Sequence, residues 1–355
     1  MSEIRSYTDI SSLQAYLLKQ MYFLQDFPVG AKVLFQLLEI KGDNAVQTFD
    51  QLHALVPHWL EYSHGKYLLS SAKAQKLKKF LNPDLSDVNL MMETLIKIFY
   101  DINSDGITDK FEYEQIAIKI MSNANRPTVT LARLVGAYGH YLFEIEKYDL
   151  AQEYLEIAIE YLNRLQKNSP FVFDIVADLG FVYLSQEKYQ EAEDLAVEYL
   201  KRLSFFRGDK KGFIIQLYFI LAESYRNREN FKQALTLYLR ILDILDKDKV
   251  SNYAFRMNLH WLISVCYKAM KNYSSALGHV NKAIECAQKA ESRGAQFYLL
   301  LYKVENDFLK RKLKQQKIIN VILTVVVSFG VFVLLIMAMY FIIWVILTLL
   351  RELFA

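Results

Sequence analysis

A fourfold internal repeat is the feature that most constrains how this chain can fold. Each copy has an alanine at the same place in its pattern, 41 or 42 residues from the next one (151 to 192, 192 to 234, 234 to 276). An aromatic residue stands three positions before each alanine, and a small residue stands twelve positions before it. The aromatic residues are Tyr148, Tyr189, Phe231 and Tyr273, and the small residues are Gly139, Gly180, Ala222 and Ser264. Because small residues let antiparallel helices approach closely, each copy is predicted to be a helical hairpin that stacks on its neighbours.

This spacing resembles that of the tetratricopeptide repeat (TPR) family, in which a small residue, a tyrosine and two alanines occupy these relative places. The copies are longer than the usual repeat of about 34 residues, as in kinesin light chains and many bacterial signalling proteins. The resemblance covers residues 132–290, and its departures are local, since Tyr199 and Ile241 replace the second alanine. It implies a mostly α-helical fold built around a TPR-like α-solenoid.

Proteins of this family bind partners in a concave groove lined by the first helix of each hairpin. The resemblance places nine residues of this chain in such a groove: His140, Asp178, Phe181, Phe219, Glu223, Arg226, Trp261, Val265 and Lys268. Among them, Phe181, Phe219 and Trp261 would form an exposed stripe that suits an apolar or aromatic peptide side chain. The alternative is that these rings pack into the solenoid itself. The Lys/Asn clamp with which some members hold acidic C-termini is absent at these positions.

Residues 318–350 contain no charged residue, which is typical of a membrane-spanning helix. At about 1.5 Å per residue the segment would be roughly 50 Å long, against about 30 Å of hydrocarbon, so we expect a tilt or a bend near Ser328 and Gly330. A re-entrant hairpin is the alternative. Five basic residues precede the segment: Lys310, Arg311, Lys312, Lys314 and Lys317. The positive-inside rule then predicts a single-pass, tail-anchored membrane protein with a cytoplasmic N-terminal part and its C-terminus on the far side.

Residues 101–112, DINSDGITDKFE, match the calcium-loop pattern D-x-[DN]-x-[DN]-G-x5-E in full and resemble an EF-hand. The metal ligands would be Asp101, Asn103, Asp105, the Ile107 carbonyl, Asp109 and Glu112. Two features oppose this interpretation, since Thr108 stands where an aliphatic residue is usual and the chain has no second loop. The alternative is a polar turn in a degenerate extra hairpin at 88–123, where Ala117 lies 41 residues before Ala158. Both readings stay open, and Ca²⁺ is the only cofactor that the sequence suggests.

Residues 1–85 lack the repeat. Helices are predicted over 29–40 and 48–56, with Thr48 as the N-cap of the second, and a β-hairpin with its turn at 63–66 follows. This order resembles a winged helix. A winged helix followed by TPR repeats resembles the C-terminal part of large signal-transduction ATPases.

Nucleic-acid binding is not expected from this unit. The candidate recognition helix offers only Gln51 and His53 beside Asp50 for reading base edges. The whole chain carries a net charge of +3, from 42 basic and 39 acidic residues, so it has no strong field to attract phosphates.

Enzymatic activity and a small-molecule substrate are not expected either. The sequence contains no nucleotide-binding motif, no zinc-protease motif and no serine-hydrolase motif, and its six histidines are scattered. No kinase, cyclase or phosphatase signature follows the apolar segment.

The predicted organisation has five parts. They are a winged-helix-like unit at 1–85, an EF-hand-like or degenerate TPR hairpin at 86–125, four TPR-like repeats at 130–295, a capping and juxtamembrane basic helix at 296–317, and a transmembrane helix at 318–350. The leading hypothesis is a membrane-anchored scaffold that binds a protein or peptide in its groove. The alternatives are a calcium-responsive regulator that uses residues 101–112, and a signalling or transcription-linked component that acts through the N-terminal unit.

Overall fold

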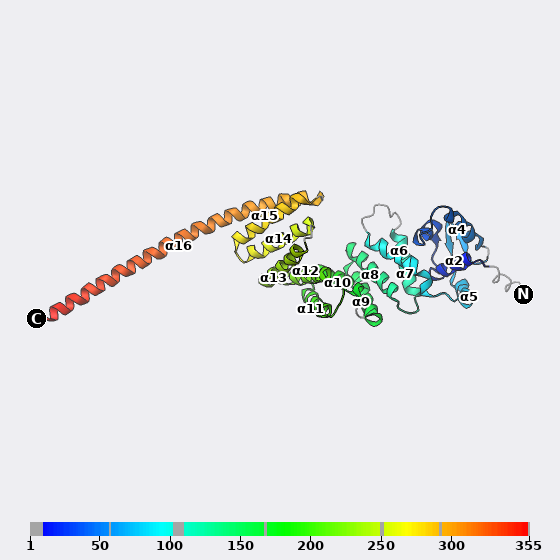
Figure 1. The fold of residues 1–355 in the computed structure, drawn as a ribbon, viewed down its shortest axis with the longest axis horizontal. Helices are drawn as coiled ribbons and strands as arrows, with labels where there is room; N and C mark the ends of the chain where they lie inside the picture. The colour runs from blue at the N-terminus through cyan, green and yellow to red at the C-terminus, as the bar shows by residue number, and fades with distance from the viewer. Residues whose placement is uncertain are drawn as a thin grey trace. The chain divides into compact units, whose positions relative to one another are not determined.

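The computed structural model describes residues 10–56, 58–101, 110–166, 169–248, 252–290 and 293–353 (Figure 1). Of the side chains after Val331, only those of Leu334 and Met339 are described. The chain divides into two compact units, Met1–Ser224 and Tyr225–Ala355, and each is described by itself. The division falls within one helix, and the bounds of the five predicted parts stay predictions.

The N-terminal part of the first unit combines short helices with a small antiparallel sheet. In chain order its elements are α2 (Ser12–Phe23), β1 (Val29–Gly30), α3 (Ala31–Leu37), α4 (Asp43–Ala54), β2 (Glu61–Ser63), β3 (Lys66–Leu68) and α5 (Ser71–Leu81). The strand order is β1-β3-β2, with Tyr62 opposite Tyr67 in the hairpin. The hairpin turns at His64 and Gly65, whose φ angles of 52° and 77° suit a two-residue turn. The predicted hairpin is therefore confirmed.

The predicted start of the second helix is wrong. Thr48 lies inside α4, where its hydroxyl donates a 2.6 Å hydrogen bond to the carbonyl oxygen of Asn44 one turn earlier. A threonine inside a helix bonds the preceding turn in this way, so its presence does not by itself mark a helix start. The helix begins at Asp43, whose negative charge in the first turn is favourable there.

Two further helices lie between this part and the repeats. A short 3-10 helix, η1 (Leu85–Val88), leads into α6 (Asn89–Tyr100), and α7 (Lys110–Asn123) follows. Tyr113 and Ala117 of α7 are buried, as the extra-hairpin interpretation requires. However, α6 packs mainly against the first helix of the next hairpin and only lightly against α7. The pair therefore departs from the regular repeat.

Four helical hairpins follow, and they confirm the TPR-like α-solenoid. Their helices are α8 (Val129–Glu144), α9 (Tyr148–Leu165), α10 (Pro170–Ser185), α11 (Tyr189–Ser204), α12 (Lys211–Asn227), α13 (Phe231–Lys247), α14 (Tyr253–Ala269) and α15 (Tyr273–Lys289). The aromatic residue of each repeat is the first residue of its second helix. The turn before it has the same form in every hairpin, because Glu146, Glu187, Glu229 and Lys271 all have φ between 60° and 62°.

The small residues of the pattern lie where helices touch. Ala151, Ala192, Ala234 and Ala276 are all 0% exposed. A Cβ atom added at Gly139 would lie 2.8 Å from Cγ of Leu155 in the facing helix, and one at Gly180 would lie 2.6 Å from Cδ1 of Ile220. A side chain at either glycine would therefore force the facing leucine or isoleucine to shift.

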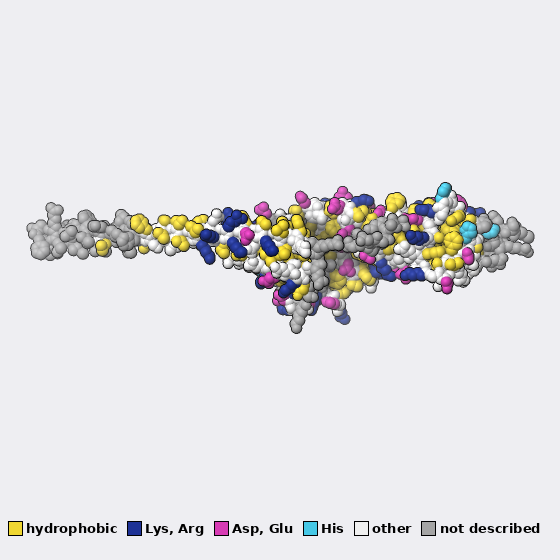
Figure 2. Space-filling view, turned by 90° about the horizontal axis from the view of Figure 1, so that it is seen from above, with side chains coloured by type: hydrophobic (Ala, Val, Ile, Leu, Met, Phe, Trp, Pro, Cys, Tyr) yellow, Lys and Arg dark blue, Asp and Glu magenta, His cyan; other side chains and the backbone are white. Residues whose placement is uncertain are grey.

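The last helix, α16 (Arg293–Leu353), is unbroken through Ser328 and Gly330, so the re-entrant hairpin is wrong. Its first part packs against α15 and buries Tyr302 and Leu309, as expected of a helix that ends the solenoid. Figure 2 shows hydrophobic side chains along α16 beyond a cluster of lysine and arginine. Among the residues that the structure describes, no helix is both long and apolar enough to span a membrane.

The close approach of the helices predicts opposite effects for two helical glycines. Gly139→Ala should lower the free energy of unfolding by about 1–3 kcal/mol, because the new methyl group collides with Leu155. Gly278→Ala in α15 should raise it by about 0.5–1 kcal/mol, because nothing lies within 4 Å and alanine favours the helix. Urea unfolding of the full chain in detergent, followed by circular dichroism, measures both. Equal stabilisation by the two changes would contradict the packing described here.

Candidate functional site: an acidic pocket on the inner helices

The first helices of successive hairpins, α6, α8, α10 and α12, are called the inner helices below. Residues on neighbouring inner helices contact one another. The ring of Tyr100 in α6 lies 4.8 Å, centroid to centroid, from the imidazole of His140 in α8. His140 Nδ1 in turn lies 3.2 Å from Oδ1 of Asp178 in α10. One turn further along α10, Phe181 lies 6.2 Å, centroid to centroid, from Phe219 in α12. Four of the nine predicted groove residues are thus brought together within the first unit.

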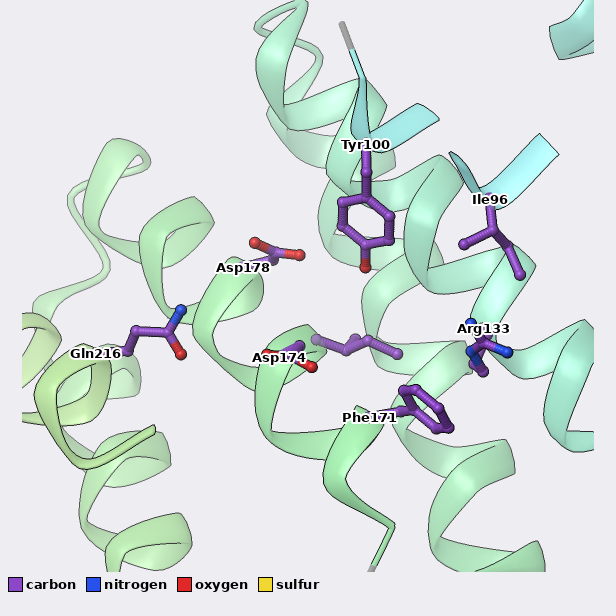
Figure 3. Close-up of a pocket in the computed structure, with 8 residues that line it drawn as sticks. Ile96, Tyr100, Arg133, Phe171, Asp174, Asp178 and Gln216 are labelled. Carbon is purple, nitrogen blue, oxygen red and sulfur yellow. The ribbon is translucent and has the colours of Figure 1, made fainter. Parts of the chain in front are cut away.

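A pocket of about 350 Å³ opens beside this row of residues (Figure 3). It is lined by Ile96, Tyr100, Arg133, Phe171, Asp174, Ile175, Asp178 and Gln216. These residues come from α6, α8, α10 and α12, so the pocket exists only when consecutive hairpins stack. Its size is at the lower end of the range for small-molecule and side-chain pockets.

Among the described residues of the pocket wall, the cation Arg133 already has partners. Arg133 Nη1 lies 2.5 Å from Oε1 of Glu93. The guanidinium carbon of Arg133 also lies 4.2 Å from the centre of the Phe171 ring. The positive charge of Arg133 is therefore paired with Glu93 and stacked on a ring.

Asp174 and Asp178 stand one turn apart on α10 and put two carboxylates into the pocket. Partial desolvation by the surrounding side chains first, and then the negative charge of Asp178, raise the pKa of Asp174 to about 6, although the residue as a whole is exposed to solvent. Within the part of the chain that the structure describes, Asp174 has no ion-pair partner. Its carboxylate is an uncompensated negative charge at neutral pH.

The negative charge of Asp178 also affects the pKa values of its neighbours His140 and Tyr100. Burial alone would lower the pKa of His140, but its close polar contact with the Asp178 carboxylate and the charges of Asp178 and Glu144 together raise it. Burial of the Tyr100 hydroxyl raises the pKa of that group, the charges of Asp178 and Asp174 add to the effect, and Arg133 opposes it. Tyr100 is therefore a neutral hydroxyl, while His140 tends toward the protonated form beside Asp178.

Gln216 completes the wall from α12. In Figure 3 its amide extends toward the two aspartates. The Oε1 atom of Gln216 is buried and accepts no hydrogen bond from any residue that the structure describes. Leaving a buried acceptor without a donor costs free energy, so this atom is a place where a ligand could supply the missing donor.

Sequence reasoning identified His140 and Asp178 but missed Tyr100, Asp174 and Gln216. One signal was present, because two aspartates spaced by four residues interrupt the apolar stretch PFVFDIVADLG of α10. Four-residue spacing puts both on one face of a helix. Tyr100 and Gln216 join them only through the stacking of α6 and α12, which no local pattern reveals.

Two of the predicted groove residues in the second unit, Trp261 and Lys268, contact α16. Trp261 lies 4.9 Å, centroid to centroid, from Tyr302, and Lys268 Nζ lies 2.7 Å from Oε1 of Glu305. Val265 is half-buried, and Glu223 and Arg226 lie near the end of α12. The three rings of the predicted stripe, Phe181, Phe219 and Trp261, are all half-buried, between the two alternatives. Partner binding by these residues stays a prediction.

The proposed calcium ligands Asn103, Asp105, Ile107 and Asp109 lie outside the described residues. Asp101 is exposed at the end of α6. Glu112 is occupied elsewhere, because its Oε1 accepts a 3.2 Å hydrogen bond from the Gly30 amide and its Oε2 lies 3.4 Å from Lys66 Nζ. No group of three or more potential metal ligands occurs among the residues placed by the structure. The calcium site stays a prediction.

No family model matches the sequence, and no curated protein matches it. Several solved structures resemble its fold. TPR-like repeats of a Podosopora anserina kinesin light chain are 15% identical and cover 55% of this chain and 97% of their own, with a TM-score of 0.42. RapI in its apo form is 17% identical and covers 79% of this chain and 74% of its own, with a TM-score of 0.48. A signal transduction ATPase with a tetratricopeptide repeat sensor from Pyrococcus horikoshii is 12% identical and covers 88% of this chain and 57% of its own, with a TM-score of 0.43. Because every TM-score is below 0.5, these similarities carry no argument about function.

The uncompensated charge of Asp174 predicts that removing it stabilises the protein. A raised pKa means that this carboxyl favours the folded state below pH 4 and loses that contribution as the pH rises through about 6. Asp174→Asn should therefore raise the free energy of unfolding at pH 7.5, by less than about 1 kcal/mol for a solvent-exposed carboxylate, and have no effect near pH 4. Urea unfolding at the two pH values measures this, with Asp194→Asn on α11 as the matched control. A loss of stability at pH 7.5 would contradict the assigned environment.

The contacts of Glu112 predict a structural role that does not need calcium. Glu112→Ala should lower the free energy of unfolding by about 1–3 kcal/mol in a chelator, because the Gly30 amide loses its acceptor. If residues 101–112 also bind calcium, adding millimolar calcium should stabilise the natural protein but neither Glu112→Ala nor Asp101→Ala. Thermal unfolding with and without calcium, in constant magnesium, separates the two contributions. Unchanged stability of Glu112→Ala in chelator would refute the structural role.

Proposed function

We propose that this protein is a non-enzymatic scaffold, tethered to a membrane, that binds a protein partner along the inner helices of its repeats. The observation that carries the proposal is the pocket between α6, α8, α10 and α12, whose Asp174 carboxylate lacks an ion-pair partner and whose Gln216 carbonyl lacks a donor among the described residues. Polar groups that lack hydrogen-bond or ion-pair partners inside a pocket favour the binding of a ligand that supplies those partners. The described residues that line the pocket include no serine, threonine, cysteine, lysine or histidine.

A protein partner fits this surface better than a small molecule. The half-buried rings of Phe181 and Phe219 continue the surface along α10 and α12, beyond the pocket itself. An extended segment of a partner could place one side chain in the pocket and lay another on these rings. Such a combination of a filled pocket and flanking apolar contact is typical of peptide recognition.

The membrane tether is supported by the surface of α16. Residues 318–350 contain no charged residue. Between Ile318 and Val331 the large apolar side chains that the structure describes are 51–67% exposed, which is a long apolar surface without cover. In water such a surface is strongly unfavourable, whereas in a bilayer it is stable. The basic residues at 310–317 would then lie at the cytoplasmic headgroups.

We further propose that the N-terminal part is a winged-helix-like unit that caps the solenoid rather than reading DNA. The order of its helices and hairpin supports this topology. Its contacts with α7 support the capping role, since Asn123 donates a 3.0 Å hydrogen bond to the Phe23 carbonyl and Glu112 accepts one from Gly30. Solenoids need such end units to cover their terminal apolar faces.

Site-specific photocrosslinking in cells tests where a partner binds. The photoreactive residue p-benzoyl-phenylalanine is placed at Phe181 on the inner helices or, as a control, at Phe205, which is 82% exposed at the end of α11. We expect a discrete adduct from position 181 and none from position 205. Adducts of equal yield from both positions would contradict binding on the inner helices.

Fractionation of the same cells tests the tether. The full chain should float with membranes in a density gradient and resist extraction by high salt and by carbonate. A chain truncated after Lys317 should move to the soluble fraction while its position-181 adduct persists. Flotation of the truncated chain would contradict a tether formed by the apolar part of α16.

A further inference from the structure

We infer that the pocket on the inner helices receives a lysine or arginine side chain from an extended segment of the protein partner. This inference rests on the proposed function and names the chemistry that the pocket selects. Its starting point is the chemical character of the pocket wall. Three acceptor groups lie at the cavity, the carboxylates of Asp174 and Asp178 and the buried Oε1 of Gln216.

The charges around the cavity do not balance. Asp174 and Asp178 both line it, and only Asp178 has a neighbour that can carry a positive charge, His140 at 3.2 Å. Arg133 is held by Glu93 at 2.5 Å and by the Phe171 ring. A second positive charge is therefore missing, and an anionic ligand would meet repulsion from both carboxylates.

The pocket also lacks a hydrogen-bond donor for one of its buried acceptors. The buried Oε1 of Gln216 accepts no hydrogen bond from the residues that the structure describes. A lysine ammonium brings three donors and an arginine guanidinium five, and neither brings an acceptor. Such a group can bond both Asp174 and Gln216. A purely apolar side chain would leave these acceptors buried and unsatisfied, which costs free energy.

The apolar part of the wall suits the stem of a long basic side chain. Ile96, Ile175 and the ring of Tyr100 line the same cavity. Lysine and arginine pack their methylene groups along such surfaces while the charged end reaches a polar site. An aromatic ring beside the cation adds a favourable interaction. The cavity of about 350 Å³ has room for one such side chain.

The surface next to the pocket indicates why the cation would belong to a polypeptide. Phe181 follows Asp178 by three residues on α10 and packs on Phe219. A segment with a basic residue and a nearby apolar residue would contact the acids and the rings at once. A free polyamine or amino acid would gain only the first contact.

The test starts with a phage-displayed library of linear 12-residue peptides, selected on the full-length protein in detergent. Peptides that lose binding to a Phe181→Glu variant are synthesised. Their affinity is measured by fluorescence anisotropy for the natural protein, for Asp174→Asn and for the control Asp194→Asn. Each peptide is also made with its basic residues replaced one at a time by norleucine. Circular dichroism verifies that every variant is folded.

We expect the selected peptides to share one lysine or arginine. Asp174→Asn and the norleucine peptide should each bind about tenfold or more weakly, and the two changes together should cost little more than one alone, as for a direct charge pair. Asp194→Asn should bind like the natural protein.

Three results would overturn the inference. Peptides that need Phe181 but are indifferent to Asp174→Asn would leave the proposed function standing and refute the basic-residue pocket. Displacement of the peptides by spermidine or free arginine at equal concentration would assign the pocket to a small cation. Recovery of no peptide that depends on Phe181 would refute both the inference and the proposed binding surface.

Discussion

The structure depends on the close approach of paired helices at small residues. Gly139 and Gly180 let a facing leucine or isoleucine come within contact distance of the helix backbone, and the alanines of each second helix are fully buried. Interiors are packed so densely that one added methyl group is felt. The same turn, with a residue at φ near 60°, closes each hairpin. Within the first unit these constraints fix how α8 faces α10 and how α10 faces α12.

The candidate site is a consequence of that stacking. Tyr100, His140 and Asp178 come from three successive first helices and touch in a row, and Asp174 and Gln216 extend the row into a pocket. Polar groups that the fold leaves without partners on such a surface are available to form hydrogen bonds or ion pairs with a ligand.

Sequence patterns revealed the repeats because small and aromatic residues recur at fixed spacing wherever helices pack. They placed His140 and Asp178 in the predicted groove because the groove positions of the family that the repeats resemble recur with the same period. They could not reveal Tyr100 or Gln216, whose place in the pocket depends on the packing of one hairpin on another. The start of α4 was misplaced because Thr48 bonds to the Asn44 carbonyl within the helix instead of capping it. Nor could the loop pattern at 101–112 reveal that Glu112 holds the Gly30 amide.

Titration of His140 by NMR, in the natural protein and in Asp178→Asn, tests most directly whether the first helices face each other as described. The Asp178 carboxylate holds the pKa of His140 above its ordinary value of 6.5, against the effect of burial. Without that carboxylate, burial should dominate and the pKa should fall. A fall in the pKa of selectively labelled His140 in Asp178→Asn is the expected result. The same pKa in both proteins would show that α8 and α10 do not bring these residues together.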